Sequence, residues 1–550
     1  MKMTQMQRGF LCLLLALAMI ALTACSAGPP ARLLPVQEQD AEDDGLSRYL
    51  VVVEDEPDTV DFQCTTIYYT VATNVFDRLV EMENDADGSS VIRPSLASSW
   101  EVSDDGRVYT FHLRENVRFS NGSLLTASDV LYTFTRLLTW PGASNRDIAA
   151  VIEGADRLTR GETDELEGIS LLSDHDFTIT LSAPYEAFLA CLSMPGASIL
   201  DRESTEAAVD RFGKDPACTV GTGPFILREW EPEKGMVLTA NPDCWSGPPA
   251  CEGMVWSFMT ESSEIRTLFE NGGLDILDLD DLDNSAEYFY HGDIYQDRLR
   301  DVRRIALTYV ALNESVAPLD DVRVRKALQL ALNRETLLDA VYSGRGSVEN
   351  GIFPRGLCGY NPELPEIPYD PDGARELLAE AGYPAGFDLS ISVRASSTQG
   401  DIALVKLIAS MWEKVGVRAS VDVMDEGEFM RLRKSGALAC YTAMWTADFN
   451  DPDNFIYTFF GSRENTVFRS LGYPDGEIMD RVQRARTIRD ASARLSEYRE
   501  LERVIVQEDA AWIPLFSRLR FYVLGERVEG FRTSWNGSVK NNYRYFSVKG

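Results

Sequence analysis

Two charged side chains, Arg394 and Asp448, each follow a predicted β-strand in the same stretch of the chain. Ligands of open α/β sheets gather beyond the carboxyl ends of the strands, and the loops 394–400 and 446–454 lie at two such ends. One cleft would then present a cation and an anion, which suits a zwitterion because a guanidinium binds a carboxylate and a carboxylate binds an ammonium. Spacing alone favours the plainer alternative, in which Asp448 caps its own loop and Arg394 is a solvated surface residue.

Motifs for catalysis are sparse. The three histidines, His112, His175 and His291, do not form a zinc-peptidase pattern, and neither a Gly-x-Ser-x-Gly elbow nor a phosphate-binding Gly-Lys-Ser/Thr loop is present. Gly221-Thr-Gly223 is a weak signal, and carboxylate pairs are uninformative in a chain with 86 acidic residues. We therefore expect a protein that is not an enzyme and has no cofactor, catalytic residue or metal site.

The elements that must position Arg394 and Asp448 lie within residues 388–445. Apolar residues alternate over 389–393 as in a strand, recur at helical spacing over 402–415, and alternate again over 417–423 after Gly416. This order predicts strand, helix and parallel strand, and a further strand over 438–445 leads into the second loop.

Several helices carry their own start and stop signals. Thr126-Ala-Ser-Asp129 resembles a capping box, and Asp370-Pro371 predicts a helix that Gly382 ends. Either Asp320 or Asp321 is expected to open another helix. Short strands alternate with such helices from Tyr49 onward, so the chain is expected to have an α/β fold with two or three domains.

The amino terminus predicts export. Residues 1–24 hold two basic residues and a short apolar run, and Leu22-Thr-Ala-Cys25 ends the run as in a lipidation box, which makes Cys25 the expected lipidation site. The alternative is an ordinary secretory signal in which Cys25 is incidental. Residues 25–46 are rich in proline, glycine and acid, as in a disordered tether.

Charge and cysteine content narrow the partners. The formal charge of -33 becomes -35 once Lys2 and Arg8 leave with the signal, which argues against nucleic acid and against direct adhesion to anionic lipid. Seven cysteines remain in the body of the chain, so at least one thiol is unpaired, and we assign no pairing. They are Cys64, Cys191, Cys218, Cys244, Cys251, Cys358 and Cys440.

Four stretches in order resemble the extracellular solute-binding proteins, family 5, that serve oligopeptide and dipeptide ABC transporters. The first is 94–134, which begins Pro-Ser-Leu-Ala-Ser-Ser-Trp and ends Ser-Asp-Val-Leu-Tyr-Thr-Phe; the second joins 220–225 with 241–245. The third and fourth are 321–334 and 369–383. The resemblance covers nearly all of the chain after the tether.

The resemblance implies a two-lobed periplasmic-binding-protein-like (type II) fold with an extra domain inserted in the first lobe. Lobe one would take residues 47–88, 216–300 and 512–550, the inserted domain 89–215, and lobe two 301–511. The chain would cross between the lobes near residues 300 and 511, which would form the hinge.

The resemblance also assigns roles to site residues. Trp445-Thr-Ala-Asp448 matches the family motif in which the aspartate holds the α-ammonium of a peptide, and Arg394 falls within one position of an arginine that holds the α-carboxylate in dipeptide-binding members. Tyr68, Tyr69 and Thr70 precede a segment that contacts the peptide backbone, with core packing as an equal alternative. Trp445 and Phe449 are expected to wall a side-chain pocket or to belong to the core, with Thr446 between them.

The sequence therefore predicts a monomeric, lipid-anchored extracytoplasmic binding protein that captures short peptides and delivers them to an ABC transporter permease. The expected site residues are Tyr68, Tyr69, Thr70, Arg394, Trp445, Thr446, Asp448 and Phe449. Alternatives are the same fold binding an oligosaccharide, nickel or haem, a peptide-sensing surface receptor, and a secreted hydrolase. The small number of histidines argues against nickel and haem as ligands. Asp448 argues against a neutral sugar, which would give a buried carboxylate no countercharge.

Overall fold

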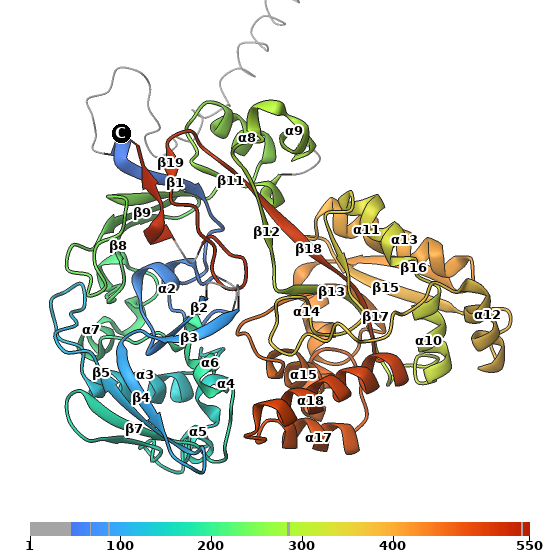
Figure 1. The fold of residues 1–550 in the computed structure, drawn as a ribbon, viewed down its shortest axis with the longest axis horizontal. Helices are drawn as coiled ribbons and strands as arrows, with labels where there is room; N and C mark the ends of the chain where they lie inside the picture. Colours follow the sequence, from blue (N-terminus) through green and yellow to red (C-terminus); the bar gives the residue numbers. More distant parts are fainter. Residues whose placement is uncertain (1–45, 67, 86–88, 283–285, 541–542, 550) are drawn as a thin grey trace, which may run out of the picture.

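The computed structural model describes residues 46–550 apart from 67, 86–88, 283–285, 541–542 and 550, and it has two lobes side by side (Figure 1). The expected signal peptide (1–24), the lipidation site Cys25 and all of the expected tether (25–46) except Leu46 lie outside the described residues. Leu46–Arg48 forms a turn of 3-10 helix that leads into the first strand.

Lobe one, on the left in Figure 1, is built on one half of a twelve-stranded sheet. β1 runs parallel to β10 and β11, whereas β8, β9 and β10 form antiparallel pairs. Alternate residues of β1 are buried, as expected for a strand with one face on a core. The strands are β1 (Tyr49–Val53), β8 (Phe225–Glu231), β9 (Gly235–Ala240), β10 (Gly253–Ser257) and β11 (Ile276–Asp278), and the helices are α2 (Thr70–Val75), α8 (Ser262–Glu270) and α9 (Ala286–His291).

A smaller unit lies below lobe one in Figure 1 and has its own four-stranded antiparallel sheet, in the order β4, β5, β7, β6. Its core joins this sheet to α3, where Phe111, Phe134 and Phe177 are fully buried. A hairpin of β2 (Val80–Asn84) and β3 (Ser90–Pro94) connects it to lobe one. Its elements are β4 (Ala97–Val102), β5 (Val108–Leu113), β6 (Ile169–Leu171), β7 (Asp176–Thr180), α3 (Ala127–Thr139), α4 (Asp147–Ala150), α5 (Ala155–Thr159), α6 (Phe188–Leu192) and α7 (Arg202–Ala208).

Lobe two, on the right in Figure 1, holds the other half of the large sheet. Its strands are β13 (Ala306–Leu312), β14 (Gly346–Val348), β15 (Asp388–Arg394), β16 (Arg418–Met424) and β17 (Cys440–Thr446). Its helices are α10 (Val322–Leu330), α11 (Arg334–Tyr342), α12 (Pro371–Glu380), α13 (Gln399–Glu413), α14 (Glu426–Lys434), α15 (Asp453–Phe460), α16 (Arg463–Phe468), α17 (Glu477–Ala485) and α18 (Ala491–Arg503).

Two strands connect the lobes. The long strand β18 (Trp512–Leu524) pairs with β13 and β14 through its first half and with β11 and β12 through its second half. β12 (Leu299–Arg303) leads through Arg304 and Ile305 into β13. The large sheet is therefore continuous across both lobes, and a short pair, β19 (Val528–Glu529) and β20 (Ser547–Val548), follows near the carboxyl terminus.

The predicted strand, helix, strand unit of lobe two is confirmed. β15 pairs in parallel with β16, α13 connects them, and Trp412 of α13 is fully buried in the core of this lobe. β15 also runs parallel to β17. The loops after β15 and β17 therefore lie at the same edge of the sheet.

The predicted helix signals are confirmed as well. Thr126 and Asp129 form a reciprocal capping box at the start of α3. Asp321 and Asp370 cap α10 and α12 by accepting hydrogen bonds from backbone N–H groups, and Gly382 follows α12 with a φ of 93°.

Candidate functional site

The loop between β17 and α15 presents Asp448 to the space between the lobes. The N–H of Ala447 donates to the carbonyl of Ile305 in the connection between the lobes, at 2.8 Å. Asn454 closes the loop: its Oδ1 accepts from the N–H of Asp448 at 3.0 Å, and its Nδ2 donates to the Asp448 carboxylate at 3.0 Å. The direction of the Asp448 side chain is therefore fixed from both ends of the loop.

Burial raises the pKa of Asp448 above its ordinary value, and the hydrogen bond from Asn454 and the positive charge of Arg469 oppose this shift. Among the described residues, no lysine or arginine forms an ion pair with Asp448. Asp448 is partly buried, and a carboxylate that has lost part of its solvation is costly without an ion-pair partner unless a ligand supplies the charge.

Two further aspartates of the same loop anchor it to the helices of lobe two. Asp451 accepts two hydrogen bonds from the guanidinium of Arg494, at 2.6 and 2.8 Å. Asp453 accepts from the hydroxyl of Tyr498 at 2.8 Å and from Arg486 at 3.2 Å. Bidentate and charge-assisted bonds of this kind hold a loop rigidly.

Asp453 also joins the lobes. The hydroxyl of Tyr185, in the small unit, donates to it at 2.6 Å in a buried position. An ion pair across the same boundary joins Arg489 and Glu186 at 3.5 Å. The loop that carries Asp448 is therefore bonded to the opposite side.

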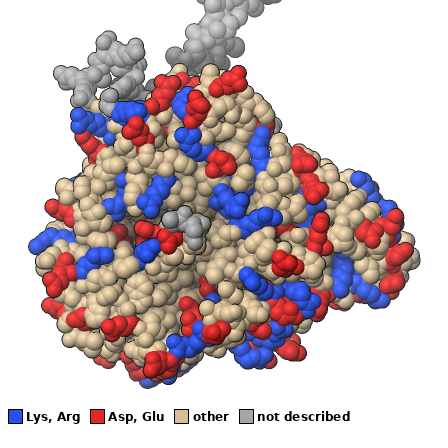
Figure 2. Space-filling model, viewed as in Figure 1, with Lys and Arg blue, Asp and Glu red and all other residues tan. Residues whose placement is uncertain are grey.

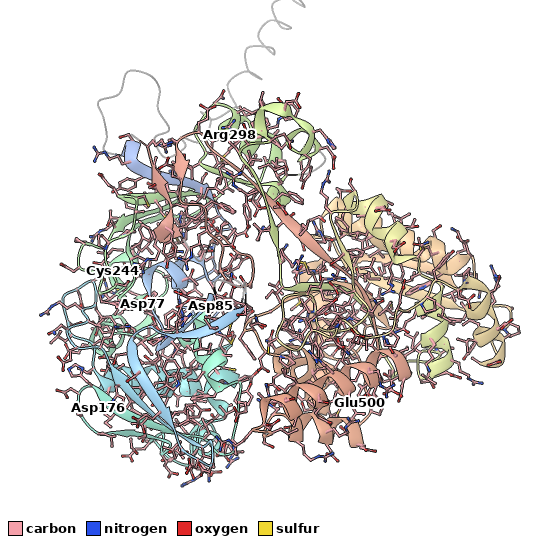
Figure 3. All side chains as sticks on the ribbon, in the orientation of Figure 1. Asp77, Asp85, Asp176, Cys244, Arg298 and Glu500 are labelled. Carbon is pink, nitrogen blue, oxygen red and sulfur yellow. The ribbon has the colours of Figure 1, made fainter. Side chains whose placement is uncertain are left out.

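A cavity of about 870 Å³ lies between the lobes beside this loop. Of the predicted site residues, Tyr69, Thr70, Thr446 and Asp448 line it. Acidic and basic side chains are interspersed on the face of the molecule shown in Figure 2. Asp77, another lining residue, lies in the left-hand lobe in Figure 3.

The wall opposite Asp448 includes Tyr69 at the start of α2. Burial and then the neighbouring Asp448 carboxylate raise the pKa of Tyr69, and its hydroxyl donates to the carbonyl of Thr65 at 2.9 Å. The hydroxyl of Thr70 donates to Glu54 at 3.3 Å. Tyr69 and Thr70, two predicted residues from the amino-terminal half of the chain, thus face the predicted residue Asp448 across the cavity.

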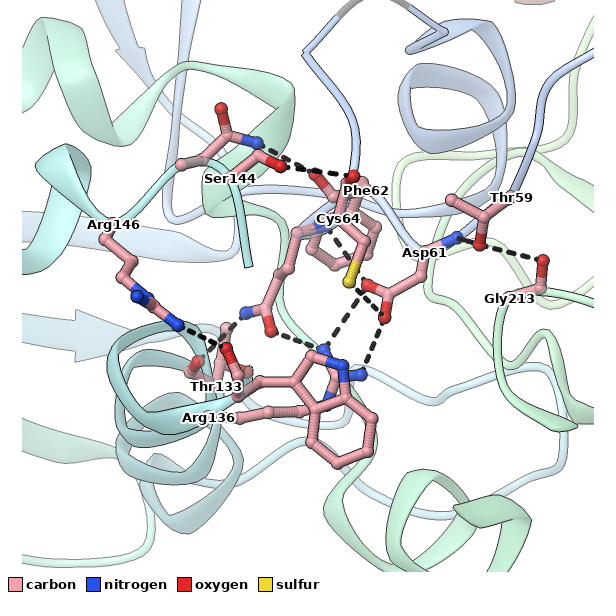
Figure 4. A network of polar contacts seen from close by, with 12 residues as sticks. Thr59, Asp61, Phe62, Cys64, Thr133, Arg136, Ser144, Arg146 and Gly213 are labelled. Carbon is pink, nitrogen blue, oxygen red and sulfur yellow. Dashed lines mark hydrogen bonds and ion pairs between the residues drawn. The ribbon is translucent and has the colours of Figure 1, made fainter. Parts of the chain in front are cut away.

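A buried polar network fixes the segment before Tyr68–Thr70 (Figure 4). The Arg136 guanidinium of α3 pairs with Asp61 at 2.6 Å and donates to Gln63 at 2.5 Å. The Gln63 amide in turn donates to the carbonyl of Thr133, at 2.9 Å. The small unit therefore helps to position the wall that faces Asp448.

Arg394 does not line the cavity. Its half-exposed guanidinium pairs with Glu426 at 3.3 Å and lies over the ring of Phe429. Tyr68 does not line the cavity either, and burial, then Asp55, Asp58 and Glu426, raise its pKa. The structure therefore does not bring Arg394 and Asp448 together around one cavity.

Trp445 and Phe449 lie behind the cavity wall. The Trp445 indole donates to Asn454 at 3.3 Å, and its ring lies 4.4 Å from the Arg469 guanidinium. Phe449 extends from lobe two into the core of the small unit, where it is 7% exposed. Phe449 therefore contributes a contact between the lobes.

Sequence reasoning missed residues 532–540 and 543–545 near the carboxyl terminus, which supply much of the other wall. Arg532, Trp535, Lys540, Arg544 and Tyr545 all line the cavity. The segment lacks the periodicity of a strand or helix that would have pointed to a buried wall. Its only local signal is the turn at Asn536-Gly537, where Gly537 has a φ of 85° and approaches the carbonyl of Arg303.

All seven cysteines of the described chain are free thiols. In the same part of the chain, no cluster of histidine, cysteine, aspartate and glutamate is arranged to hold a metal ion. Nor does any described helix combine the length and apolar character that crossing a bilayer requires.

Comparison with known proteins identifies the class. Residues 91–466 match the model of the bacterial extracellular solute-binding proteins, family 5, and the chain belongs to this family. Its members are the substrate-binding components of ABC transporters and are not enzymes. The resemblance that the sequence motifs indicated is confirmed.

Individual relatives align over most of their length. The chain is 30% identical to di/tripeptide-binding protein 2 of Pseudomonas aeruginosa, over 82% of this chain and 85% of that one. It is 29% identical to heme-binding protein A of Haemophilus influenzae, over 85% and 86% of the two chains.

Solved structures share the fold. The periplasmic binding protein DppA of Helicobacter pylori, solved with the peptide STSA, superposes with a TM-score of 0.76 at 24% identity, covering 92% of this chain and 100% of that chain. The predicted type II two-lobed fold is confirmed.

Proposed function

We propose that this protein captures short peptides in the cavity between its lobes and delivers them to the permease of an ABC transporter. The observation that carries the proposal is Asp448, a carboxylate that lines the cavity and forms no ion pair with a lysine or arginine of the described residues. An α-ammonium group would neutralise it. The names of the dipeptide- and di/tripeptide-binding relatives support the same ligand class.

In this proposal the walls contact the backbone of the peptide. Tyr69 and Thr70 from lobe one and Thr446 from lobe two would border the extended chain, with Tyr68 further out. Main-chain contacts give affinity that tolerates many side chains. Trp445 and Phe449 would support the wall from behind, since the first contacts Asn454 and the second packs in the small unit.

We keep Arg394 as a proposed carboxylate ligand for a dipeptide. Its guanidinium is already paired with Glu426, so binding would require exchange of one carboxylate for another. Such an exchange gains little free energy at an exposed site. We therefore expect the Arg394→Gln variant to weaken the binding of dipeptides only slightly.

We also propose an extracytoplasmic, monomeric protein that Cys25 anchors to the membrane after removal of residues 1–24, with 25–46 as tether. The proposed division is lobe one at 47–88, 216–300 and 512–550, an inserted domain at 89–215, and lobe two at 301–511. The pairing of β18 with strands of both lobes supports placing the second crossing within this strand, after residue 511.

Haem is the second candidate ligand, because heme-binding protein A is among the relatives. Neither histidine nor cysteine is among the described residues that line the cavity, although Met82, Met194, Tyr69 and Tyr545 are. Nickel and oligosaccharide remain weaker candidates, and a signalling receptor would bind the same peptides without delivering them.

A thermal-shift screen of residues 26–550 tests the proposal against pooled di- to pentapeptides, haem, nickel and cello-oligosaccharides. A ligand at about 100 times its dissociation constant adds about 2.7 kcal/mol of stability. We expect one peptide pool to raise the melting temperature, and its N-acetylated counterpart to lose the effect. A shift with haem, sugar or nickel and with no peptide pool would show that peptide capture is wrong.

A further inference from the structure

The cations that line the cavity divide into two groups. Four are neutralised by acidic partners within the protein: Arg78 by Glu81, Arg304 by Asp280, Arg520 by Asp278 and Lys540 by Glu54. Arg532 and Arg544 form no ion pair with any carboxylate of the described chain. Two positive charges on the wall of lobe one are therefore left for a ligand or solvent.

Both guanidinium groups lie against one ring. The guanidinium carbon of Arg532 is 4.2 Å from the ring centroid of Tyr545, and that of Arg544 is 5.7 Å from it. Stacking on an aromatic ring holds a guanidinium without using its N–H donors. The planar donors of Arg532 thus remain available.

The position of Arg544 is also built by hydrogen bonds. Its Nη1 donates to the hydroxyl of Ser246 at 2.8 Å, and its Nη2 donates to the carbonyls of Ser246 and Gly247 at 3.2 Å each. These acceptors are neutral, so they orient the group and leave its charge uncompensated. A pre-oriented guanidinium loses less entropy when it binds a carboxylate.

The two walls of the cavity therefore carry opposite unpaired charges. Lobe two presents Asp448, and lobe one presents Arg532 and Arg544. A ligand with an ammonium at one point and a carboxylate at another would satisfy both walls, and it would bridge the lobes in doing so.

We propose that Arg532 and Arg544, stacked on Tyr545, form a carboxylate-binding subsite for the peptide whose ammonium Asp448 holds. The inference rests on the proposed peptide function and adds a specificity for anionic peptide groups on the lobe-one wall. The carboxylate is either the peptide's carboxyl terminus or an acidic side chain. Arg394, the proposed ligand for the carboxylate of a dipeptide, already pairs with Glu426, so this subsite would bind a carboxylate more strongly than Arg394 does.

The test compares peptides that differ only in one carboxylate. Calorimetric titrations use Ala-Ala-Ala and its carboxyl-terminal amide, then Ala-Glu-Ala-amide and Ala-Gln-Ala-amide. Each peptide is titrated into the wild-type protein and into Arg532→Gln, Arg544→Gln and the double variant. Arg532→Gln is expected to fold normally, because its exposed side chain makes no hydrogen bond to the described residues.

We expect the double variant to bind one of the carboxylate-bearing peptides about 10- to 100-fold more weakly and its uncharged analogue almost unchanged. Loss confined to Ala-Ala-Ala would assign the subsite to the carboxyl terminus, and loss confined to Ala-Glu-Ala-amide would assign it to an acidic side chain. Equal affinities in wild type and double variant, or equal losses for all four peptides, would overturn the inference.

Two controls keep the outcomes apart. Arg211→Gln removes an arginine that is 65% exposed and outside the cavity, and it should leave every affinity unchanged. Arg394→Gln run in parallel would overturn the inference if it alone abolished the preference for a carboxylate. Failure of the wild-type protein to bind any peptide would instead refute the proposed function.

Discussion

The two walls of the cavity are built by opposite means. The wall of lobe two is a short loop at the end of β17, fixed by the ion pairs of Asp451 and Asp453 and by Asn454, and it presents the partly buried carboxylate of Asp448 to the cavity. The wall of lobe one combines Tyr69 and Thr70 with residues 532–540 and 543–545. The N–H of Ile305, in the connection between the lobes, donates to the carbonyl of Asn536 at 3.4 Å. An anion on the fixed loop of lobe two thus shares the cavity with cations on the wall of lobe one, and a ligand that bound both would couple the lobes.

Removal of the Asp448 charge should have the largest effect. We expect Asp448→Asn to weaken binding of peptides with a free amino terminus by about 2–5 kcal/mol, because the variant leaves the buried ammonium without its counter-charge. Isothermal titration calorimetry with the peptide pool that stabilises the wild type provides the measurement.

Glu83→Gln is the matched control, since Glu83 is another carboxylate of the cavity lining. Its affinity for the same peptides should stay within about twofold of wild type. If Glu83→Gln and Asp448→Asn weakened binding equally, general electrostatic attraction would explain the result better than a specific ammonium site.

Removal of the hydrogen bond between Tyr185 and Asp453, which joins the lobes, should have the next largest effect. Tyr185→Phe and Tyr498→Phe each remove one hydroxyl that donates to Asp453, so both should lower the free energy of unfolding by about 1.5–3 kcal/mol. Only Tyr185 belongs to the opposite side. Tyr185→Phe alone should therefore increase the radius of gyration in small-angle X-ray scattering and weaken peptide binding.

The two tyrosine variants form a matched pair because they share an acceptor. Equal changes in the radius of gyration for both variants would show that Asp453 serves lobe two only. Unchanged scattering for both would show that the bond between the lobes does not limit opening.

The effect of pH on peptide binding should be smaller than the effects of these substitutions, but it would identify Asp448 as the group that must be ionised. Asp448 must be ionised to bind an ammonium, and burial raises its pKa, so affinity should fall as pH drops through a range above that of an ordinary aspartate. The fall is at most about tenfold per pH unit, and the peptide α-amino group sets an upper limit near pH 8. Asp448→Asn should remove the acidic limb, and an acidic limb that persists in this variant would assign it to another group.

The smallest effect should be that of Asp448→Asn on the stability of the ligand-free protein. There the substitution should be favourable, whereas it should be unfavourable for peptide binding. Since the folded-state pKa of Asp448 is raised, its ionised form favours unfolding, and this penalty grows as pH rises through that pKa. Asp448→Asn should therefore raise the melting temperature slightly at neutral pH, because its side-chain oxygen still accepts from Asn454. A lower melting temperature would mean that the carboxylate stabilises the loop.

Local patterns predicted the loop that carries Asp448 but not the part of the lobe-one wall near the carboxyl terminus. The alternation over 389–393, the helical spacing over 402–415 and the residues after β17 are signals within short segments, so the loop carrying Asp448 could be placed at the correct edge of the sheet. The Arg544 contact with Ser246 joins residues 298 positions apart in a segment without periodicity. Such a contact depends on how the lobes assemble, which no local pattern encodes.

Phe449 and Arg394 also show that a local pattern does not predict which side chains line the cavity. The sequence placed both beside Asp448, because one is adjacent in the chain and the other follows a parallel strand. Which cavity a side chain lines depends on the neighbours that compete for it: the core of the small unit takes Phe449, and Glu426 pairs with Arg394.

A thermodynamic cycle between the protein and its ligand tests the site most directly. Calorimetry would compare the best-binding peptide and its N-acetylated form with wild type and Asp448→Asn, using competition where binding is weak. We expect N-acetylation to weaken binding to the wild type by about 100-fold and to Asp448→Asn by no more than about twofold. Equal penalties in the two proteins would contradict the capture of a peptide ammonium by Asp448.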